Sequence, residues 1–83
     1  MAYVECTVNE GLRPLEATVS VMGTDGRRRF LRVERDFVRN DHLLPVGIVH
    51  KDLNAKRSLI ELPHESDSGE NRVWVKQEQI QEN

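Results

Sequence analysis

The sequence predicts a small all-β domain, either a barrel or a sandwich of five to six short strands with at most single helical turns. Apolar and polar residues alternate with a period of two in several short segments, and glycine, proline and aspartate separate these segments. No longer stretch shows the period of an amphipathic helix. A chain of 83 residues corresponds to one domain, residues 1–83, with a small core.

Composition narrows the class of protein further. The net charge is −2, so the chain as a whole offers no electrostatic case for binding nucleic acid or an acidic surface. Cys6 is the only cysteine, which excludes an intramolecular disulfide and favours a reducing compartment. The N-terminal residues do not read as a secretory signal, and no apolar run approaches the roughly 20 residues of a membrane span. We expect a cytoplasmic protein without a membrane contact.

The most apolar stretch, Leu43–Pro63, predicts a β-hairpin closed over residues 53–55. A one-residue shift of register would set Ile48 against Glu61, so the apolar match selects one register. Two prolines, Pro45 and Pro63, lack an amide donor and are expected at the outer ends of the pairing. The selected register predicts three facing pairs, which are Val46 with Leu62, Ile48 with Ile60, and His50 with Ser58.

A second hairpin is predicted from Ala17–Met22 and Arg27–Arg35. The residues between them, Thr24-Asp25-Gly26, suit a three-residue loop in which Gly26 takes a left-handed conformation. Its inner face is expected to pair Val19 with Leu31 and Ala17 with Val33.

The remaining segments are shorter. Tyr3–Val8 alternates as one half-buried strand with Cys6 on its inner side, and residues 9–14 form a turn. Asp36–His42 is either a helical turn that starts at Asp36 or a wide connection that tucks Phe37 or Val38 inward. The polar residues 64–71 predict a flexible loop. Arg72–Lys76 is the last strand, with Val73 and Val75 inward, and residues 77–80 form one helical turn that docks Ile80.

The small size, the looping meander and the late strand Val73-Trp74-Val75 followed by one turn resemble SH3-like small barrels. The resemblance extends over most of the chain and concerns architecture. The acidic aromatic loop and the terminal proline-containing motif of peptide-binding SH3 domains are absent. The resemblance therefore implies a fold and does not imply a ligand.

A basic segment, Arg27–Arg39, holds six of the nine arginines and only two acidic residues. Arg28, Phe30 and Arg32 fall on one side of the predicted strand. Arginines beside an aromatic ring hold single-stranded nucleic acid in small barrels through phosphate contacts and base stacking. The competing interpretation is that Phe30 packs beneath a loop or subunit and that the arginines pair with nearby carboxylates.

Trp74 is the second candidate binding residue. It points opposite Val73 and Val75, so it is either an outward binding residue or a plug for an open barrel end. Together with Phe30 it would form an exposed apolar patch that favours self-association.

His50 and Asp52 form a possible polar site, because they share a strand face and a carboxylate can orient an imidazole for acid–base catalysis. The simpler interpretation is a histidine at a strand end that bonds to Ser58 or to solvent. No spacing of histidine, cysteine, aspartate or glutamate matches a metal site, and we expect no cofactor. Cys6 is expected to be a small buried apolar residue.

Three functions follow from these observations. The first is a non-enzymatic binding or assembly module that acts as a homo-oligomer or on a protein partner. The second is binding of single-stranded nucleic acid through Arg27–Arg39. The third is an enzyme whose site forms between subunits, as in the oligomeric SH3-like trimethoprim-resistant dihydrofolate reductases, although their Val-Gln-Ile-Tyr strand is absent here. We expect no catalytic activity.

Overall fold

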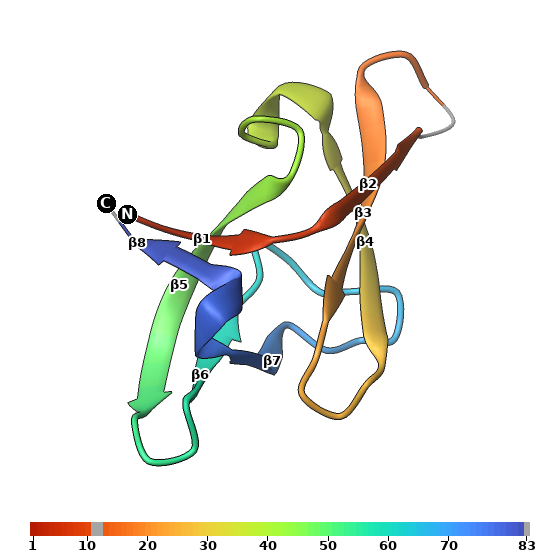
Figure 1. Ribbon diagram of the computed structural model, residues 1–83. Helices are drawn as coiled ribbons and strands as arrows, with labels where there is room; N and C mark the ends of the chain where they lie inside the picture. Colours follow the sequence, from red (N-terminus) through yellow and green to blue (C-terminus); the bar gives the residue numbers. More distant parts are fainter. Residues whose placement is uncertain (11–12, 83) are drawn as a thin grey trace.

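Two antiparallel sheets pack against each other in residues 1–10 and 13–82, the part of the chain that the computed structural model describes (Figure 1). One sheet has five strands in the order β7-β6-β5-β1-β8, and the other has three in the order β2-β3-β4. The all-β prediction is confirmed. Strand pairing within these residues does not close a barrel, so the sandwich alternative describes the fold. The strands are β1 (Ala2–Glu5), β2 (Thr7–Glu10), β3 (Glu16–Met22), β4 (Arg28–Glu34), β5 (Leu43–Asp52), β6 (Arg57–Glu61), β7 (Arg72–Lys76) and β8 (Ile80–Glu82).

The first strand was predicted as one unit, Tyr3–Val8, and this is wrong. The chain pairs with β5 as far as Glu5, opposite Leu43, and pairs with β3 from Thr7, opposite Ser20. At Cys6, between the two partners, the backbone N–H donates a 2.9 Å hydrogen bond to the carbonyl of His42. One segment therefore contributes to both sheets, and the change of partner divides it into β1 and β2. The predicted turn that follows includes Gly11 and Leu12, which lie outside the described residues.

The β3–β4 hairpin forms as predicted. Val19 faces Leu31 and Ala17 faces Val33, and Gly26 has a φ of +80° in the connecting turn. The Asp25 carboxylate accepts a 3.0 Å hydrogen bond from the Arg27 amide, which is typical of an aspartate in a tight turn.

The central hairpin, β5–β6, keeps the predicted pair of Ile48 and Ile60, but His50 does not face Ser58. An irregularity between Ile48 and His50 sets His50 opposite Leu59 and Lys51 opposite Ser58. Because one extra residue in a strand turns the following side chains to the other face, His50 points outward. Ser58 is buried and donates a 2.8 Å hydrogen bond to the Gln77 side chain.

The outer end of this hairpin also differs from the prediction. β5 begins before its contact with β6, and Pro45 lies within the strand, opposite Tyr3 of β1. Pairing of β5 with β6 starts at Gly47, opposite Glu61, and the Leu62 amide donates instead to the Asn71 carbonyl at 2.7 Å. Val46 therefore faces Ala2 rather than Leu62.

The core lies between the sheets and consists of branched aliphatic side chains from both. Ile60 is fully buried near its centre, between its cross-strand neighbours Ile48 and Val73. The buried cluster is Val4, Val19, Val21, Leu31, Val33, Leu44, Ile60, Leu62, Val73 and Val75.

The connection after β4 combines the two alternatives expected for it. Arg35–Phe37 forms a single 3-10 turn, while Val38 packs against the core and Phe37 remains 41% exposed. At the chain end, β7 and the 3-10 turn Gln77–Gln79 form as predicted, and Ile80 packs against the core. A strand at Ile80–Glu82 that pairs with β1 was not predicted.

Residues 64–71 were predicted as a flexible loop, but they are bonded along the outer edge of β4. The Asp67 amide donates to the Phe30 carbonyl at 2.7 Å, and the His64 Nε2 atom lies 2.6 Å from the Arg32 carbonyl oxygen. Ser66 is buried. The loop thus covers backbone groups that an edge strand would otherwise leave open for pairing with another chain.

Arg29 is the charged residue that holds this loop and the β3–β4 turn together. Its side chain is only 7% exposed and lies on the same face of β4 as Leu31 and Val33. The guanidinium donates to both Asp25 carboxylate oxygens at 2.7 and 3.0 Å, to Glu70 at 3.0 Å and to the Arg27 carbonyl at 2.8 Å. We call Asp25, Arg29 and Glu70 the Arg29 cluster.

The Arg29 cluster predicts a loss of stability in acid. Its hydrogen bonds lower the pKa of Asp25 to about 2, and the Arg29 side chain likewise lowers the pKa of Glu70. A carboxyl group with a depressed pKa stabilises the fold fully above its unfolded pKa, and this contribution disappears as the pH falls through the folded pKa. We expect the melting temperature measured by circular dichroism to fall between about pH 4 and pH 2. Asp25→Asn should flatten this dependence, and an unchanged slope in that variant would contradict it.

Candidate binding surface on the five-stranded sheet

The predicted basic face is only partly present. Arg28, Phe30 and Arg32 do point outward from β4, and Phe30 is 42% exposed. The Arg28 guanidinium, however, donates to Ser20 Oγ at 3.1 Å and to Thr7 Oγ1 at 3.3 Å. Arg29 points inward, and the Arg39 guanidinium lies 5.5 Å from the centroid of the Tyr3 ring. Three of the six arginines therefore already have partners within the chain.

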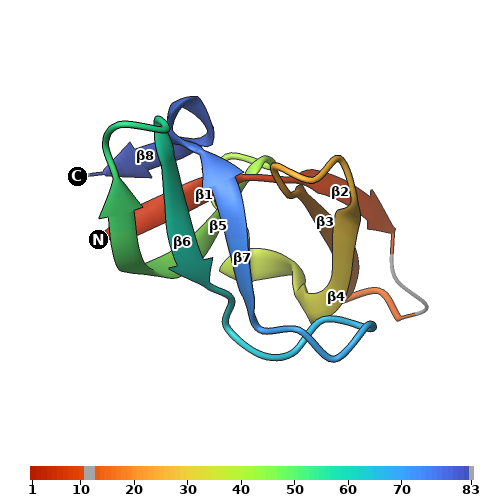
Figure 2. The same cartoon turned by 90° about the horizontal axis from the view of Figure 1, so that it is seen from below.

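Phe30 and Trp74 do not form one apolar patch. Phe30 lies on the outer face of the three-stranded sheet, while Trp74 lies on the outer face of the five-stranded sheet. Since the inner faces of the two sheets pack on each other, the outer faces point in different directions (Figures 1 and 2). The two candidates belong to separate surfaces.

The structure instead brings Trp74 and His50 together. Their ring centroids are 6.2 Å apart and their planes are perpendicular, which is a favourable edge-to-face arrangement. The Arg57 guanidinium lies 4.2 Å from the centroid of the Trp74 ring, within the range of a cation–π contact.

Strand register explains why these residues meet. The strands β5, β6 and β7 are neighbours in the sheet (Figure 2). His50 lies opposite Leu59 in β6, and Leu59 lies opposite Trp74 in β7, so the three residues form one row across these strands. Arg57 is two residues from Leu59 and shares its outward face. We call His50, Arg57, Leu59 and Trp74 the Trp74 face.

Ion pairs surround the Trp74 face and leave it with little net charge. The Asp52 carboxylate accepts from Arg57 Nε at 3.4 Å and from the Ala55 amide at 3.2 Å. Arg72 and Glu61 form a second pair at 3.2 Å on the same sheet. The Asp52 carboxylate is thus bonded to the turn and to Arg57, and no hydrogen bond joins it to His50 in the described residues, as orientation of a catalytic imidazole would require.

Sequence reasoning identified Trp74 and His50 separately and did not identify Arg57 or Leu59. The alternation Arg57-Ser58-Leu59 places both outward when Ile60 is inward, and this signal was available. The contact of His50 with Trp74 was not available, because it depends on the irregularity in β5.

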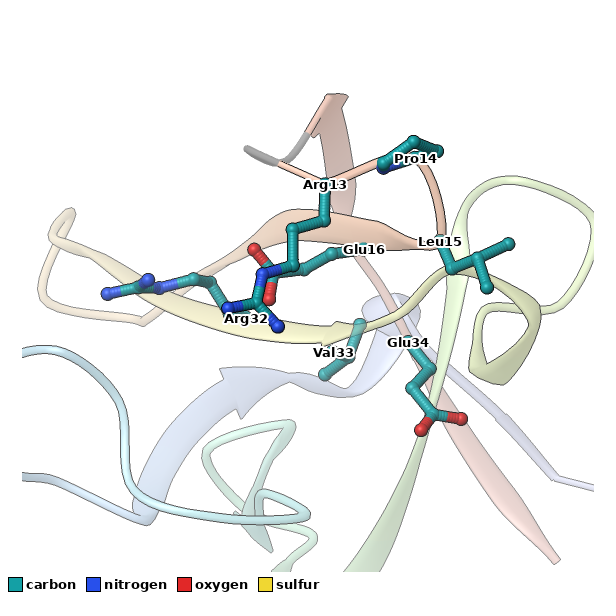
Figure 3. A pocket seen from close by; sticks show the side chains of 7 residues that line it. All are labelled: Arg13, Pro14, Leu15, Glu16, Arg32, Val33 and Glu34. Carbon is teal, nitrogen blue, oxygen red and sulfur yellow. The ribbon is translucent and has the colours of Figure 1, made fainter.

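A second surface lies at the other sheet, beside Leu15 (Figure 3). A hollow of about 720 Å³ is lined by the apolar residues Pro14, Leu15 and Val33 and by the charged residues Arg13, Glu16, Arg32 and Glu34. From the sequence, this region was predicted to be a connection between strands, and no binding site was predicted in it. An apolar residue between Pro14 and Glu16, outside any predicted strand, was the signal for it.

The Cys6 thiol, which belongs to neither surface, is not a candidate nucleophile. The pKa of the Cys6 thiol is raised to about 11 because the side chain is partly removed from water, so at neutral pH it is an uncharged thiol and a poor nucleophile. Within residues 1–10 and 13–82, no three side chains of histidine, cysteine, aspartate or glutamate gather as metal ligands. In the same residues, no helix has the length and apolar character needed to cross a bilayer.

Comparison with known proteins identified no relative of this chain. No protein family, no curated protein and no solved structure gave a significant match to this chain.

Proposed function

We propose that the chain is a non-enzymatic binding module that recognises a protein partner through the Trp74 face. The observation that carries this proposal is the stacking of Arg57 on the outward ring of Trp74, with His50 against the same ring. Tryptophan and arginine are the residues most enriched at binding hot spots. The half-buried Leu59, which lies between His50 and Trp74 in the sheet, adds to the apolar area of this face.

The geometry supports binding for two physical reasons. Arg57 is held by Asp52 and by the Trp74 ring, so little side-chain freedom remains to be lost when a partner binds. The paired charges around the face reduce its attraction to a polyanion, whereas they match the polar rim of a protein interface.

Binding of single-stranded nucleic acid through Arg27–Arg39 is the alternative. The exposed ring of Phe30, flanked by Arg28 and Arg32, supports it. The engagement of Arg28, Arg29 and Arg39 within the chain counts against it. The SH3-like resemblance is also retained as a proposal, supported by the β1–β2 segment that serves both sheets.

Capture experiments with the immobilised full chain test the proposed face. We expect proteins from an extract of the source cells that are retained by the wild type and by Arg72→Ala, and retained at least about tenfold less by Trp74→Ala and Arg57→Ala. Arg72→Ala is the matched control, because it removes an arginine from the same sheet that pairs with Glu61 and does not stack on Trp74. Melting curves confirm that each variant is folded.

Two results would overturn the proposal. One is an identical set of captured proteins for all four chains. The other is salt-sensitive binding of labelled single-stranded oligonucleotides that Phe30→Ala weakens and Trp74→Ala does not, which would establish the alternative. Because Trp74 is the only tryptophan, its emission reports directly whether a captured partner covers this face.

A further inference from the structure

Leu15 is an apolar side chain presented to solvent on a well-bonded backbone. It is 81% exposed, although it lies only one residue before β3. The Leu15 carbonyl accepts a 2.8 Å hydrogen bond from the Arg35 amide, and the Glu16 amide donates to the Arg13 carbonyl at 3.0 Å. Backbone hydrogen bonds therefore fix the position of this leucine, and its exposure is a feature of the fold.

The hollow beside Leu15 is large enough to receive a leucine side chain from another molecule. Its volume is about 720 Å³, and two smaller hollows of about 300 and 490 Å³ share Glu34 with it. These add the half-exposed Phe37 and Pro63 to the apolar lining. A protruding apolar side chain and an apolar hollow thus lie next to each other on one surface.

The charged residues of this surface have no partners within the described part of the chain. None of the five ion pairs includes Arg13, Arg32, Glu16 or Glu34. Glu16 lies directly opposite Glu34 in the β3–β4 register, and like charges in that position repel each other. The surface therefore carries two positive and two negative groups that would gain from a partner of mixed charge.

The arrangement of these groups favours a second copy of the chain over a partner of one charge sign. Arg13, Arg32 and Glu16 point to one side of the hollow, while Leu15 and Glu34 point to the other (Figure 3). In a two-fold symmetric dimer the same surface of both copies forms the interface, and the two copies run in opposite directions. Each contact between two residues therefore occurs twice, and the surface must contain both partners of each contact. Reversal would place the arginines of one copy near Glu34 of the other, and Leu15 of each copy near the opposite hollow.

We propose that two copies of this chain associate through the surface formed by Arg13, Leu15, Glu16, Arg32 and Glu34. This interface is separate from the Trp74 face and does not depend on the function proposed for that face. A dimer of this kind would leave a Trp74 face on each copy, and two linked faces would bind a multivalent partner with higher avidity than one.

Light scattering on the full chain across a dilution series from about 1 mM to about 1 µM tests this interface. We expect the wild type to approach twice the chain mass of 9.6 kDa at high concentration, and Leu15→Asp to remain at the monomer mass throughout. Leu53→Asp is the matched control, because Leu53 is 75% exposed in the β5–β6 turn at the far end of the molecule (Figure 1). That variant should dimerise like the wild type, as should Trp74→Ala.

A charge exchange separates this interface from general apolar association. Glu34→Arg should weaken dimerisation by about tenfold or more, since it places arginines against arginines, and adding Arg32→Glu should restore part of the loss. The proposal is overturned by a wild type that is monomeric at every concentration, by equal effects of Leu15→Asp and Leu53→Asp, or by an assembly larger than a dimer.

Discussion

Arg29→Ala is expected to lower the free energy of unfolding by about 3 kcal/mol and the melting temperature by about 12–24 °C. The substitution removes a buried guanidinium that joins the β3–β4 turn to the loop covering the edge of β4. It leaves Asp25 and Glu70 close together without the cation between them. The guanidinium also packs closely on Gly23, where an added Cβ atom would lie 2.6 Å from it, so its removal leaves a gap at this position.

Chemical denaturation of the wild type, Arg29→Ala and the control variant Arg32→Ala measures the free energy of unfolding of each. Arg32 lies on the same strand but points outward and has no ion pair in the described residues, so its removal should change stability by less than about 0.5 kcal/mol. Equal losses for the two variants would show that Arg29 contributes no more than an exposed arginine, and the account of the cluster would then be wrong.

Ile60→Ala is expected to destabilise the domain by about 3–4 kcal/mol, within the range for large-to-small substitutions in well-packed cores. Ile60 has no exposed surface and lies between Ile48 and Val73 of the same sheet, in a buried cluster that also contains side chains of the other sheet. For a small domain this is a large share of the total stability. Equilibrium unfolding in urea measures the effect.

Its neighbour Leu59 supplies the control for this experiment. Leu59 points to the outer face and is half-buried, so Leu59→Ala should cost only about 1 kcal/mol through its lost apolar contact area. A larger effect at Leu59 than at Ile60 would mean that β6 presents its other face to the core, and would contradict the register described here.

The local pattern of the sequence determined the fold class and most of the strands. Alternation with a period of two identified the inner faces of β3, β4, β6 and β7, because each strand had enough apolar residues to distinguish its two sides. The β3–β4 turn followed from its own residues, since Asp25 and Gly26 favour the required backbone conformation. The Ile48–Ile60 pair followed from the apolar match of adjacent strands.

Tertiary structure decided the features that depend on residues distant in the chain. The division of the first strand at Cys6 requires two different partner strands, and the docking of residues 64–71 requires the free edge of β4. A one-residue irregularity in β5 turned His50 outward and thus assembled the Trp74 face. Arg29 alternates like any other residue in a basic segment, and its burial depends on Glu70, 41 residues further along.

The physical reason for this difference is the range of the interactions. The conformation of a turn and the choice of which strand face points inward depend on residues close together in the chain, so both can be predicted from the sequence. Edge coverage, strand irregularities and buried ion pairs arise from how two sheets meet, and each is a balance between desolvation and contacts with residues far along the chain. The Trp74 face was assembled by contacts of this second kind, although Trp74 and His50 could be singled out beforehand. The surface beside Leu15 lies instead at the open end of the predicted β3–β4 hairpin.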